Sequence, residues 1–187
     1  MRERIINETT RLIQEKGFSF TVSELATKLG TSKRTIYQHF SSKDEIVDEI
    51  IEVFIHDIKQ NELEIAAKSI NVIEKIKLIL CSTPEEYEIM DIRLLSDLKK
   101  HHFQQWEKLD YFLREDWSTV RTLMNQGIEE GVLRDINLDL FIELYLGAIN
   151  QIYHSPKASQ SPLTIKEKLE AVMDILLNGV ATSEDVE

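Results

Sequence analysis

Residues 21–46, TVSELATKLGTSKRTIYQHFSSKDEI, constrain the fold of this chain more than any other stretch. Thr21 followed by Glu24 has the spacing of a capping box, and so does Ser42 followed by Glu45. In a capping box a hydroxyl and a carboxylate bind the free N–H groups at the start of a helix. The sequence therefore predicts a helix start at each position, with a short second helix between them.

The boundaries of the two short helices follow from caps and apolar spacing. Over residues 22–29 the apolar side chains recur at helical intervals, which predicts the first helix. These side chains are Val22, Leu25, Ala26 and Leu29. Gly30 supplies a tight turn after that helix. Ser32 is a preferred N-cap residue, so we expect the second helix to run over residues 33–40.

One side of this second helix is too polar to be buried. Its strongly apolar residues are Ile36 and Phe40, which lie four positions apart and define the side that faces the core. At about 100° per residue, Arg34 and Gln38 point to the opposite side. The hydrophilic residues of the helix are Lys33, Arg34, Thr35, Tyr37 and Gln38.

Such a helix is typical of a helix-turn-helix that binds DNA. There the first helix braces the second, and the amino-terminal half of the second lies in the major groove. Arg and Gln reach donors and acceptors on base edges, and Thr contacts the thymine methyl group. Lys43 stands in the first turn of the next helix, where free N–H groups favour a phosphate. The alternative is a three-helix bundle with no role in DNA binding.

In these residues the chain resembles the TetR-type bacterial transcriptional regulators. The matching positions are Gly17-Phe18, Thr21, Leu25-Ala26, Gly30, Ser32 to Tyr37, His39-Phe40 and Ser42 to Ile46. The match is specific over about residues 5–50, and beyond them it survives only as a layout of helices. Mild departures from the family pattern occur at Thr9, Ile13, Leu25, Leu29 and Thr31.

The resemblance implies which residues meet a double-stranded DNA operator. They are Thr21, Ser32, Lys33, Arg34, Thr35, Tyr37, Gln38, His39 and Lys43. Among them, Tyr37, His39 and Lys43 are expected to hold phosphates. The resemblance also implies a homodimer, which would present two recognition helices to a pseudo-palindromic site.

The net charge of −11 disfavours DNA binding until its distribution is considered. Residues 1–43 carry eight Lys and Arg against four Asp and Glu, a balance of +4. The remainder carries 14 basic and 29 acidic residues, a balance of −15. A basic amino-terminal part can therefore approach phosphates while the acidic remainder faces away.

Composition favours an all-α protein of about nine helices. Six glycines and three prolines in 187 residues are few for a sheet with many turns. We expect an N-terminal three-helix helix-turn-helix module over residues 1–46 and a larger C-terminal helical bundle over 47–180, for ligand binding and dimerisation. The tail 181–187 is expected to be disordered.

The sequence also predicts where the protein works. It has no run of about 18 apolar residues, so no membrane span is expected. The amino terminus lacks the apolar core of a secretory signal. The single cysteine, Cys81, fits a reducing compartment. The expected location is the cytoplasm.

Apolar periodicity predicts the helices around and beyond the module. We expect them over residues 2–16, 42–67, 72–80, 83–100, 103–130, 138–153 and 163–178. The last two are apolar on more than one side, which a helix at the edge of a monomer would not be. We therefore expect helices 138–153 and 163–178 to form the homodimer interface. Burial wholly inside the monomer is the alternative.

Large side chains gather in the sequence of the bundle, where the resemblance implies a small-molecule pocket. The candidates are Tyr87, Met90, Phe103, Trp106, Tyr111, Trp117, Met124 and Tyr145. Trp and Tyr line cavities while offering a polar atom. Few charges interrupt the apolar sides, so we expect a small hydrophobic ligand. Ordinary core packing is the alternative.

No catalytic, metal or cofactor site is predicted, and an enzyme is not expected. The sequence lacks a G-x-S-x-G elbow, a phosphate-binding glycine loop and H-E-x-x-H. His101 and His102 point about 100° apart on a helix, so solvent exposure at a helix end is expected. The function predicted is a ligand-responsive repressor. The alternative is a DNA-anchored adaptor whose body recruits a protein partner.

Overall fold

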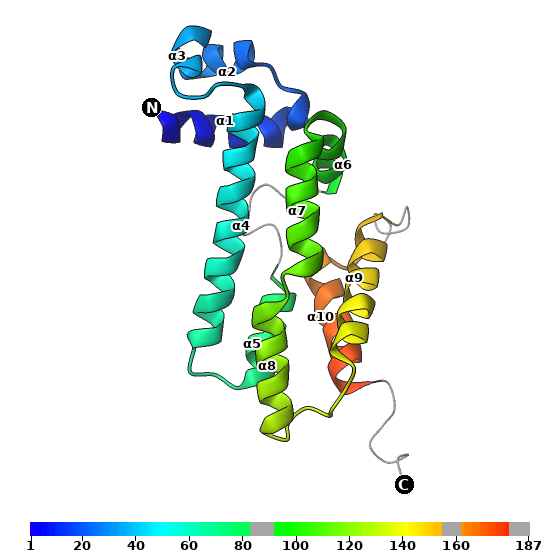
Figure 1. Ribbon diagram of the computed structural model, residues 1–187. Helices are drawn as coiled ribbons and strands as arrows, with labels where there is room; N and C mark the ends of the chain where they lie inside the picture. Colours follow the sequence, from blue (N-terminus) through cyan, green and yellow to red (C-terminus); the bar gives the residue numbers. More distant parts are fainter. Residues whose placement is uncertain (83–91, 155–161, 180–187) are drawn as a thin grey trace. The chain divides into compact units, whose positions relative to one another are not determined.

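Helices make up the described parts of the chain, which are residues 1–82, 92–154 and 162–179 of the computed structural model (Figure 1). They are α1 (Arg2–Lys16), η1 (Gly17–Ser19, a 3₁₀ turn), α2 (Val22–Leu29), α3 (Lys33–Tyr37), α4 (Lys43–Ala67), α5 (Val72–Leu80), α6 (Ile92–His101), α7 (Phe103–Glu115), α8 (Ser118–Glu129), α9 (Leu138–His154) and α10 (Ile165–Asn178). No strand occurs within these ranges. The all-α prediction is confirmed.

The helices group into two compact units. The first contains the described residues of Met1–Gln60 and Pro84–Asp116, and the second those of Asn61–Thr83 and Trp117–Glu187. This division falls within α4 and between α7 and α8. The boundary at residue 46 between a DNA-binding domain and the rest of the chain stays a prediction. The predicted tail 181–187 lies outside the described residues.

The first unit surrounds one apolar core. Figure 1 shows α1, α2 and α3 gathered around the amino-terminal end of α4. Leu25 of α2 and Ile36 of α3 are fully buried, as their helical spacing predicts. Leu98 of α6 and Leu109 of α7 belong to the same core, so these two helices pack against the amino-terminal module.

The predicted caps form in the module. Thr21 accepts the N–H of Glu24 at 3.2 Å, and the Glu24 carboxylate accepts the N–H of Thr21 at 2.8 Å. Ser32 caps α3 by accepting the N–H of Thr35 at 3.1 Å. The left-handed backbone of Gly30, with φ +63°, ends α2. Residues 22–29 are therefore helical because both ends of the helix are satisfied locally.

Two local expectations need correction. Helix α3 ends at Tyr37 rather than at residue 40, and a turn carries the chain to Phe40. The second capping box is only half formed: the N–H of Glu45 donates to Ser42 Oγ at 3.0 Å. The Glu45 carboxylate instead accepts from the N–H of Ser41 at 2.5 Å. The turn after α3 places the Ser41 amide, not that of Ser42, within reach of this carboxylate.

The prediction of one helix over 103–130 is wrong. Helices α7 and α8 are separated at Asp116 and Trp117, whose backbones leave the helical region. Asp116 instead pairs with Lys59 of α4 at 2.5 Å. Apolar spacing is the same on both sides of this break, so periodicity could not reveal it. The predicted start of α6 at residue 83 lies outside the described residues.

The second unit packs α5 against α8, and α10 against α9 and α5. Its core contains Ile76 of α5, Met124 of α8 and Met173 of α10, which are almost fully buried. A capping box of Thr164 and Glu167 begins α10. None of the described helices is both long enough and apolar enough to cross a membrane.

Candidate nucleic-acid interface

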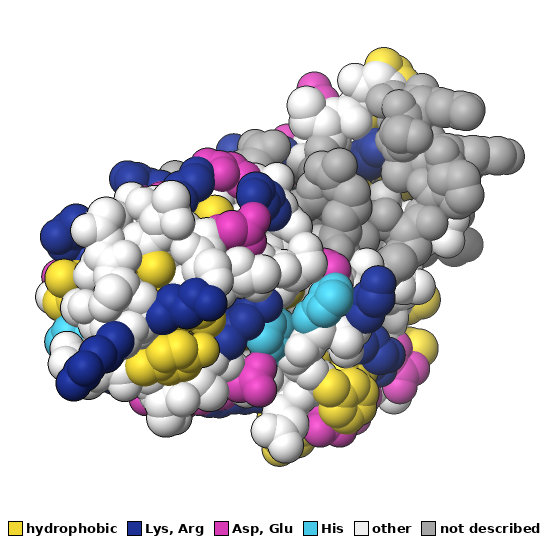
Figure 2. All heavy atoms as spheres, turned by 90° about the horizontal axis from the view of Figure 1, so that it is seen from above, with side chains coloured by type: hydrophobic (Ala, Val, Ile, Leu, Met, Phe, Trp, Pro, Cys, Tyr) yellow, Lys and Arg dark blue, Asp and Glu magenta, His cyan; other side chains and the backbone are white. Residues whose placement is uncertain are grey.

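Helix α3 turns its polar side to solvent. Lys33, Arg34, Tyr37 and Gln38 are exposed, whereas Ile36 on the opposite side is completely buried. Tyr37 keeps 48% of its surface accessible, which is unusual for a large aromatic residue. Several Lys and Arg side chains lie on the face seen in Figure 2. The side of α3 predicted to face DNA is therefore open.

Positive charge on α3 is not neutralised within the described parts of the chain. There, no carboxylate lies within ion-pairing distance of Lys33 or Arg34. By contrast, Lys16 pairs with Glu24 at 2.6 Å and Lys28 pairs with Glu15 at 2.6 Å. The module thus keeps unpaired cations on the very helix whose polar side is exposed.

The three predicted hydroxyl contacts have local roles. Thr21 and Ser32 cap α2 and α3, and both stay exposed. Thr35 is half-buried, and its hydroxyl lies 3.0 Å from that of Ser32. His39 is exposed just beyond α3. Ser32, Thr35 and His39 therefore lie in or next to α3, whereas Thr21 lies at the start of α2.

Lys43 is placed differently from the other predicted contacts. Its ammonium group donates to the Phe18 carbonyl at 2.6 Å and lies 4.2 Å from the centre of the Phe20 ring. The side chain is half-buried, and burial lowers the pKa of Lys43. Lys43 holds the turn η1 in this arrangement, which leaves at most two of its three N–H donors for a phosphate.

The turn η1 is also held from α6, by residues that sequence reasoning missed. The Phe18 N–H donates to Asp97 Oδ2 at 2.5 Å. The Phe18 ring meets the His102 ring edge-on, with 6.0 Å between centroids. Asp97 therefore binds the backbone N–H of Phe18, and Lys43 binds its backbone carbonyl. No sequence signal reveals them, because Asp97 and Phe18 lie 79 residues apart.

The expectation that His102 is exposed is wrong. His102 keeps 4% of its surface accessible, and its Nδ1 lies 2.5 Å from Asp44 Oδ1. Burial lowers the pKa of His102, while the hydrogen bond to Asp44 opposes that shift. His102 is the residue between α6 and α7, and its ring packs against the buried Phe18 ring. We therefore take the ring as neutral, with Nδ1–H donating to Asp44.

The buried His102 should make the protein less stable in mild acid. The unfolded histidine takes up a proton as the pH falls through about 6.5, whereas the buried ring resists protonation, so stability decreases below that pH. His102→Asn keeps a donor toward Asp44 and removes the titration. We expect the melting temperature of the wild type to fall more between pH 7.5 and 5.5 than that of His102→Asn. Replacing the exposed His56 with Asn should leave the wild-type pH dependence, and equal pH dependence in all three proteins would contradict the assignment.

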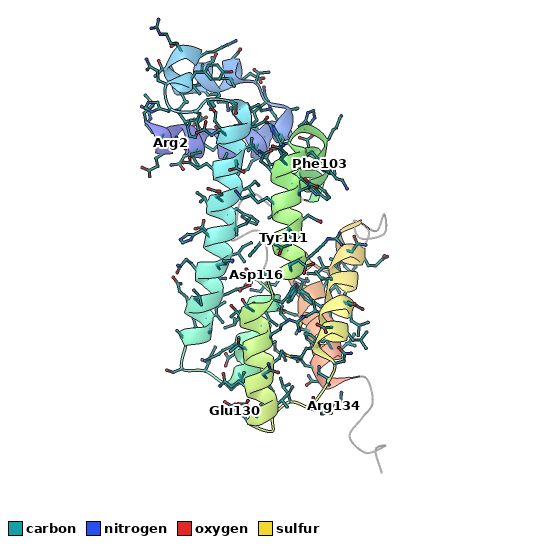
Figure 3. All side chains as sticks on the ribbon, viewed as in Figure 1. Arg2, Phe103, Tyr111, Asp116, Glu130 and Arg134 are labelled. Atoms are coloured by element: carbon teal, nitrogen blue, oxygen red, sulfur yellow. The ribbon has the colours of Figure 1, made fainter. Side chains whose placement is uncertain are left out.

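The residues predicted to line a ligand pocket are divided between the two compact units. Tyr87 and Met90 lie outside the described residues. Phe103, Trp106 and Tyr111 belong to α7 in the first unit, where Phe103 and Tyr111 are 52% and 71% exposed (Figure 3). Trp106 is instead half-buried and packs against the core of the first unit, with its ring 5.4 Å from that of Phe103 between centroids.

Three of the predicted pocket residues do come together, in the second unit. Trp117 and Tyr145 meet edge-on with 5.7 Å between ring centroids, and Met124 belongs to the same core. The Tyr145 hydroxyl donates to the Leu80 carbonyl at 2.5 Å. The Trp117 indole N–H is buried and has no partner among the described residues. This cluster combines apolar surface with one unused hydrogen-bond donor.

Helices α9 and α10 expose large apolar side chains. Leu140 and Leu144 lie four residues apart on α9 and are 52% and 54% exposed. Ile175 on α10, which packs against α9, is 53% exposed. Exposed apolar residues at helical spacing are typical of a surface that a partner covers.

Comparisons with known proteins agree with this geometry. Residues 5–50 match the model of the bacterial regulatory proteins of the tetR family. The uncharacterized HTH-type transcriptional regulator YvaF from Bacillus subtilis is 44% identical over 188 residues, which cover 100% of this chain and 99% of YvaF. The HTH-type transcriptional repressor KstR2 from Mycobacterium tuberculosis is 25% identical over 99% of this chain and 94% of KstR2.

A solved structure shows the same fold. The transcriptional regulator FadR from Bacillus subtilis, in complex with stearoyl-CoA, superposes with a TM-score of 0.71 at 19% identity. The superposition covers 97% of this chain and 100% of FadR. The helix-turn-helix match and the full-length similarity to YvaF lead to one conclusion: the chain belongs to the TetR family of bacterial transcriptional regulators.

Proposed function

We propose that this regulator is a ligand-responsive repressor that binds a pseudo-palindromic operator as a homodimer. The observation that carries the proposal is the open side of α3, where Lys33 and Arg34 are exposed and have no carboxylate partner among the described residues. Cations without internal partners are free to replace the counterions of a DNA backbone or to reach base edges. Such a protein works in the cytoplasm, where the chromosome lies.

Each residue of the interface has a proposed role. Arg34 and Gln38 read base edges in the major groove, because both are long, exposed and able to form paired hydrogen bonds. The nearby residues that complete the reading surface or bind adjacent backbone are Lys33, Thr35 and Tyr37. Phosphates are held by His39 and the Tyr37 hydroxyl. The caps Thr21 and Ser32 stand at helix starts, where free N–H groups favour phosphate. Lys43 joins them with the N–H donors that the Phe18 carbonyl does not use.

The dimer part of the proposal rests on α9 and α10. Leu140, Leu144 and Ile175 leave apolar surface exposed on two helices that pack together. A two-fold axis through this surface would bury it in both copies with the same contacts. A dimer of this kind carries two copies of α3, as a pseudo-palindromic operator requires.

The ligand part of the proposal rests on the second unit. Trp117, Met124 and Tyr145 form an apolar cluster with one unpartnered indole N–H among the described residues. KstR2 is a repressor, and FadR is known in complex with stearoyl-CoA. We infer a small ligand with a large hydrophobic part, and an acyl-CoA thioester is the first class to test. The ligand lowers DNA affinity if it binds more tightly to the state that does not fit the operator.

A mobility-shift experiment with DNA from upstream of the protein's own gene tests the proposal. We expect one fragment to bind more tightly than bulk competitor DNA at moderate salt, with two chains per operator by sedimentation. Stearoyl-CoA, but not coenzyme A alone, should release that fragment. Equal binding to all fragments would refute the regulator function. Specific binding that no acyl-CoA alters, together with capture of a protein partner by the second unit, would favour an adaptor.

A further inference from the structure

Arg2, the first residue of α1, joins three segments of the module (Figure 3). Its Nη1 donates to the His39 carbonyl at 2.6 Å, just beyond α3. Its Nε donates to Glu49 Oε2 of α4 at 2.8 Å, and Nη2 binds the same carboxylate. The guanidinium carbon of Arg2, Cζ, lies 4.1 Å from the centre of the Phe40 ring. One side chain thus connects α1, the turn after α3 and the start of α4.

The turn after α3 depends on these contacts for its polar groups. Arg2 satisfies the His39 carbonyl, and Glu45 accepts the N–H and hydroxyl of Ser41 at 2.5 and 2.6 Å. Glu45 Oε1 lies 3.6 Å from the Arg2 guanidinium, so the two groups also attract each other. Phe40 is 2% exposed and anchors the turn in the core. The guanidinium closes this arrangement from the outside.

Helix α3 needs such support because it is short. It spans only Lys33–Tyr37, and isolated helices of fewer than about 12 residues are marginal in water. Its position is therefore set by the segments at its two ends. The glycine turn from α2 holds the amino-terminal end, and the Arg2 contacts hold the carboxyl-terminal end.

We propose that Arg2 is a positioning residue for the recognition helix rather than a phosphate ligand. The proposal rests on the proposed DNA-binding function. A phosphate would have to compete with two carboxylates and a backbone carbonyl for the Arg2 guanidinium, whereas Lys33 and Arg34 face no such competition among the described residues. Arg2 thus acts on DNA affinity through the orientation of α3.

Charge changes separate positioning from direct electrostatic attraction. Arg2→Gln should weaken operator binding by about two- to fivefold, the upper part of the range measured for exposed ion pairs. The slope of log affinity against log salt should change by much less than the ~0.9 expected for one lost phosphate contact. Glu49→Gln removes a negative charge, so attraction alone predicts tighter binding. Positioning predicts weaker operator binding by Glu49→Gln. The double variant, Arg2→Gln with Glu49→Gln, should then bind the operator no more weakly than either single variant.

Arg11→Gln is the matched control. Arg11 lies on the same helix, carries the same charge and pairs with Glu8 one turn away. It should bind the operator about as well as the wild type. All variants should keep the wild-type melting temperature within a few degrees, because the changes are at exposed ion pairs.

Hydrogen exchange in the DNA-free protein tests the positioning itself. Amides of residues 33–41 should exchange faster in Arg2→Gln and Glu49→Gln than in the wild type or Arg11→Gln. Unchanged amide exchange in both variants would overturn the proposal. So would a salt slope reduced by about one in Arg2→Gln together with tighter operator binding by Glu49→Gln. If the wild-type protein prefers no DNA sequence, both the regulator function and the role of Arg2 in DNA binding are refuted. Faster amide exchange in Arg2→Gln would then still show that Arg2 positions α3.

Discussion

Gly17→Ala is expected to destabilise the protein by about 2–6 kcal/mol. Gly17 has φ +73° and ψ −168°, a region that side-chain-bearing residues adopt only at a cost of about 1–3 kcal/mol. An added Cβ would also collide with the Asp97 carboxylate. That collision would displace the acceptor of the Phe18 N–H, at a further cost of about 1–3 kcal/mol. Urea unfolding of the variant and the wild type measures the difference.

Gly30→Ala is the control for the backbone effect. Gly30 also has a positive φ, +63°, but a Cβ there would meet no atom within 4 Å. Gly30→Ala should therefore lower the free energy of unfolding by only about 1–2 kcal/mol, because only the left-handed backbone conformation is unfavourable for alanine. In an Asp97→Ala background the collision is absent, so adding Gly17→Ala there should cost only the backbone contribution of about 1–3 kcal/mol. If the two glycine variants lose equal stability, the contact between α6 and η1 does not constrain residue 17.

The largest effect on DNA binding is expected from the paired variant Arg34→Ala with Gln38→Ala. Each side chain is exposed on the open side of α3, and a bidentate contact to a base discriminates by about 1–3 kcal/mol. Loss of both should reduce affinity for the operator by about a hundredfold or more, and the single variants should relax preference at particular base pairs. The fold should persist, because exposed substitutions change stability by about 0.5 kcal/mol or less. Quantitative mobility shifts with single-base operator variants provide the measurement.

Arg134→Ala is the control for lost charge. Arg134 is exposed in the second unit, outside the residues that match the family model, and its loss should leave operator affinity nearly unchanged. Binding by Arg34→Ala that weakens equally on every DNA sequence, with a flatter salt slope, would make Arg34 a phosphate ligand. Wild-type affinity in the paired variant would remove α3 from the interface.

Much of the fold could be predicted because its signals are local. The caps at Thr21 and Ser32, and the apolar spacing of residues 22–29 and 72–80, predict α2, the start of α3 and α5 correctly. Every interaction involved joins residues within one or two helical turns. The break between α7 and α8 was missed for the same reason, since apolar spacing is preserved across Asp116.

The sequence predicts which residues of the candidate interface are exposed on α3, but not the contacts that hold the interface in place. Residue types and helical angles were enough to place Arg34 and Gln38 on the exposed side of α3. They could not show that Lys43 binds the Phe18 carbonyl or that His102 is buried against Asp44. Exposure of Phe103 and Tyr111 was likewise hidden, because large aromatic residues are usually buried and their type gives no sign of an exposed position.

Local chemistry therefore decides that this chain is helical and which side of its recognition helix is polar, since caps and periodicity act over a few residues. Packing between distant segments decides how that helix is held. Arg2 reaches His39 across 37 residues, and Asp97 reaches Phe18 across 79. Contacts of that span form only once helices have docked, because their geometry depends on the whole core of the first unit and not on any one stretch of chain.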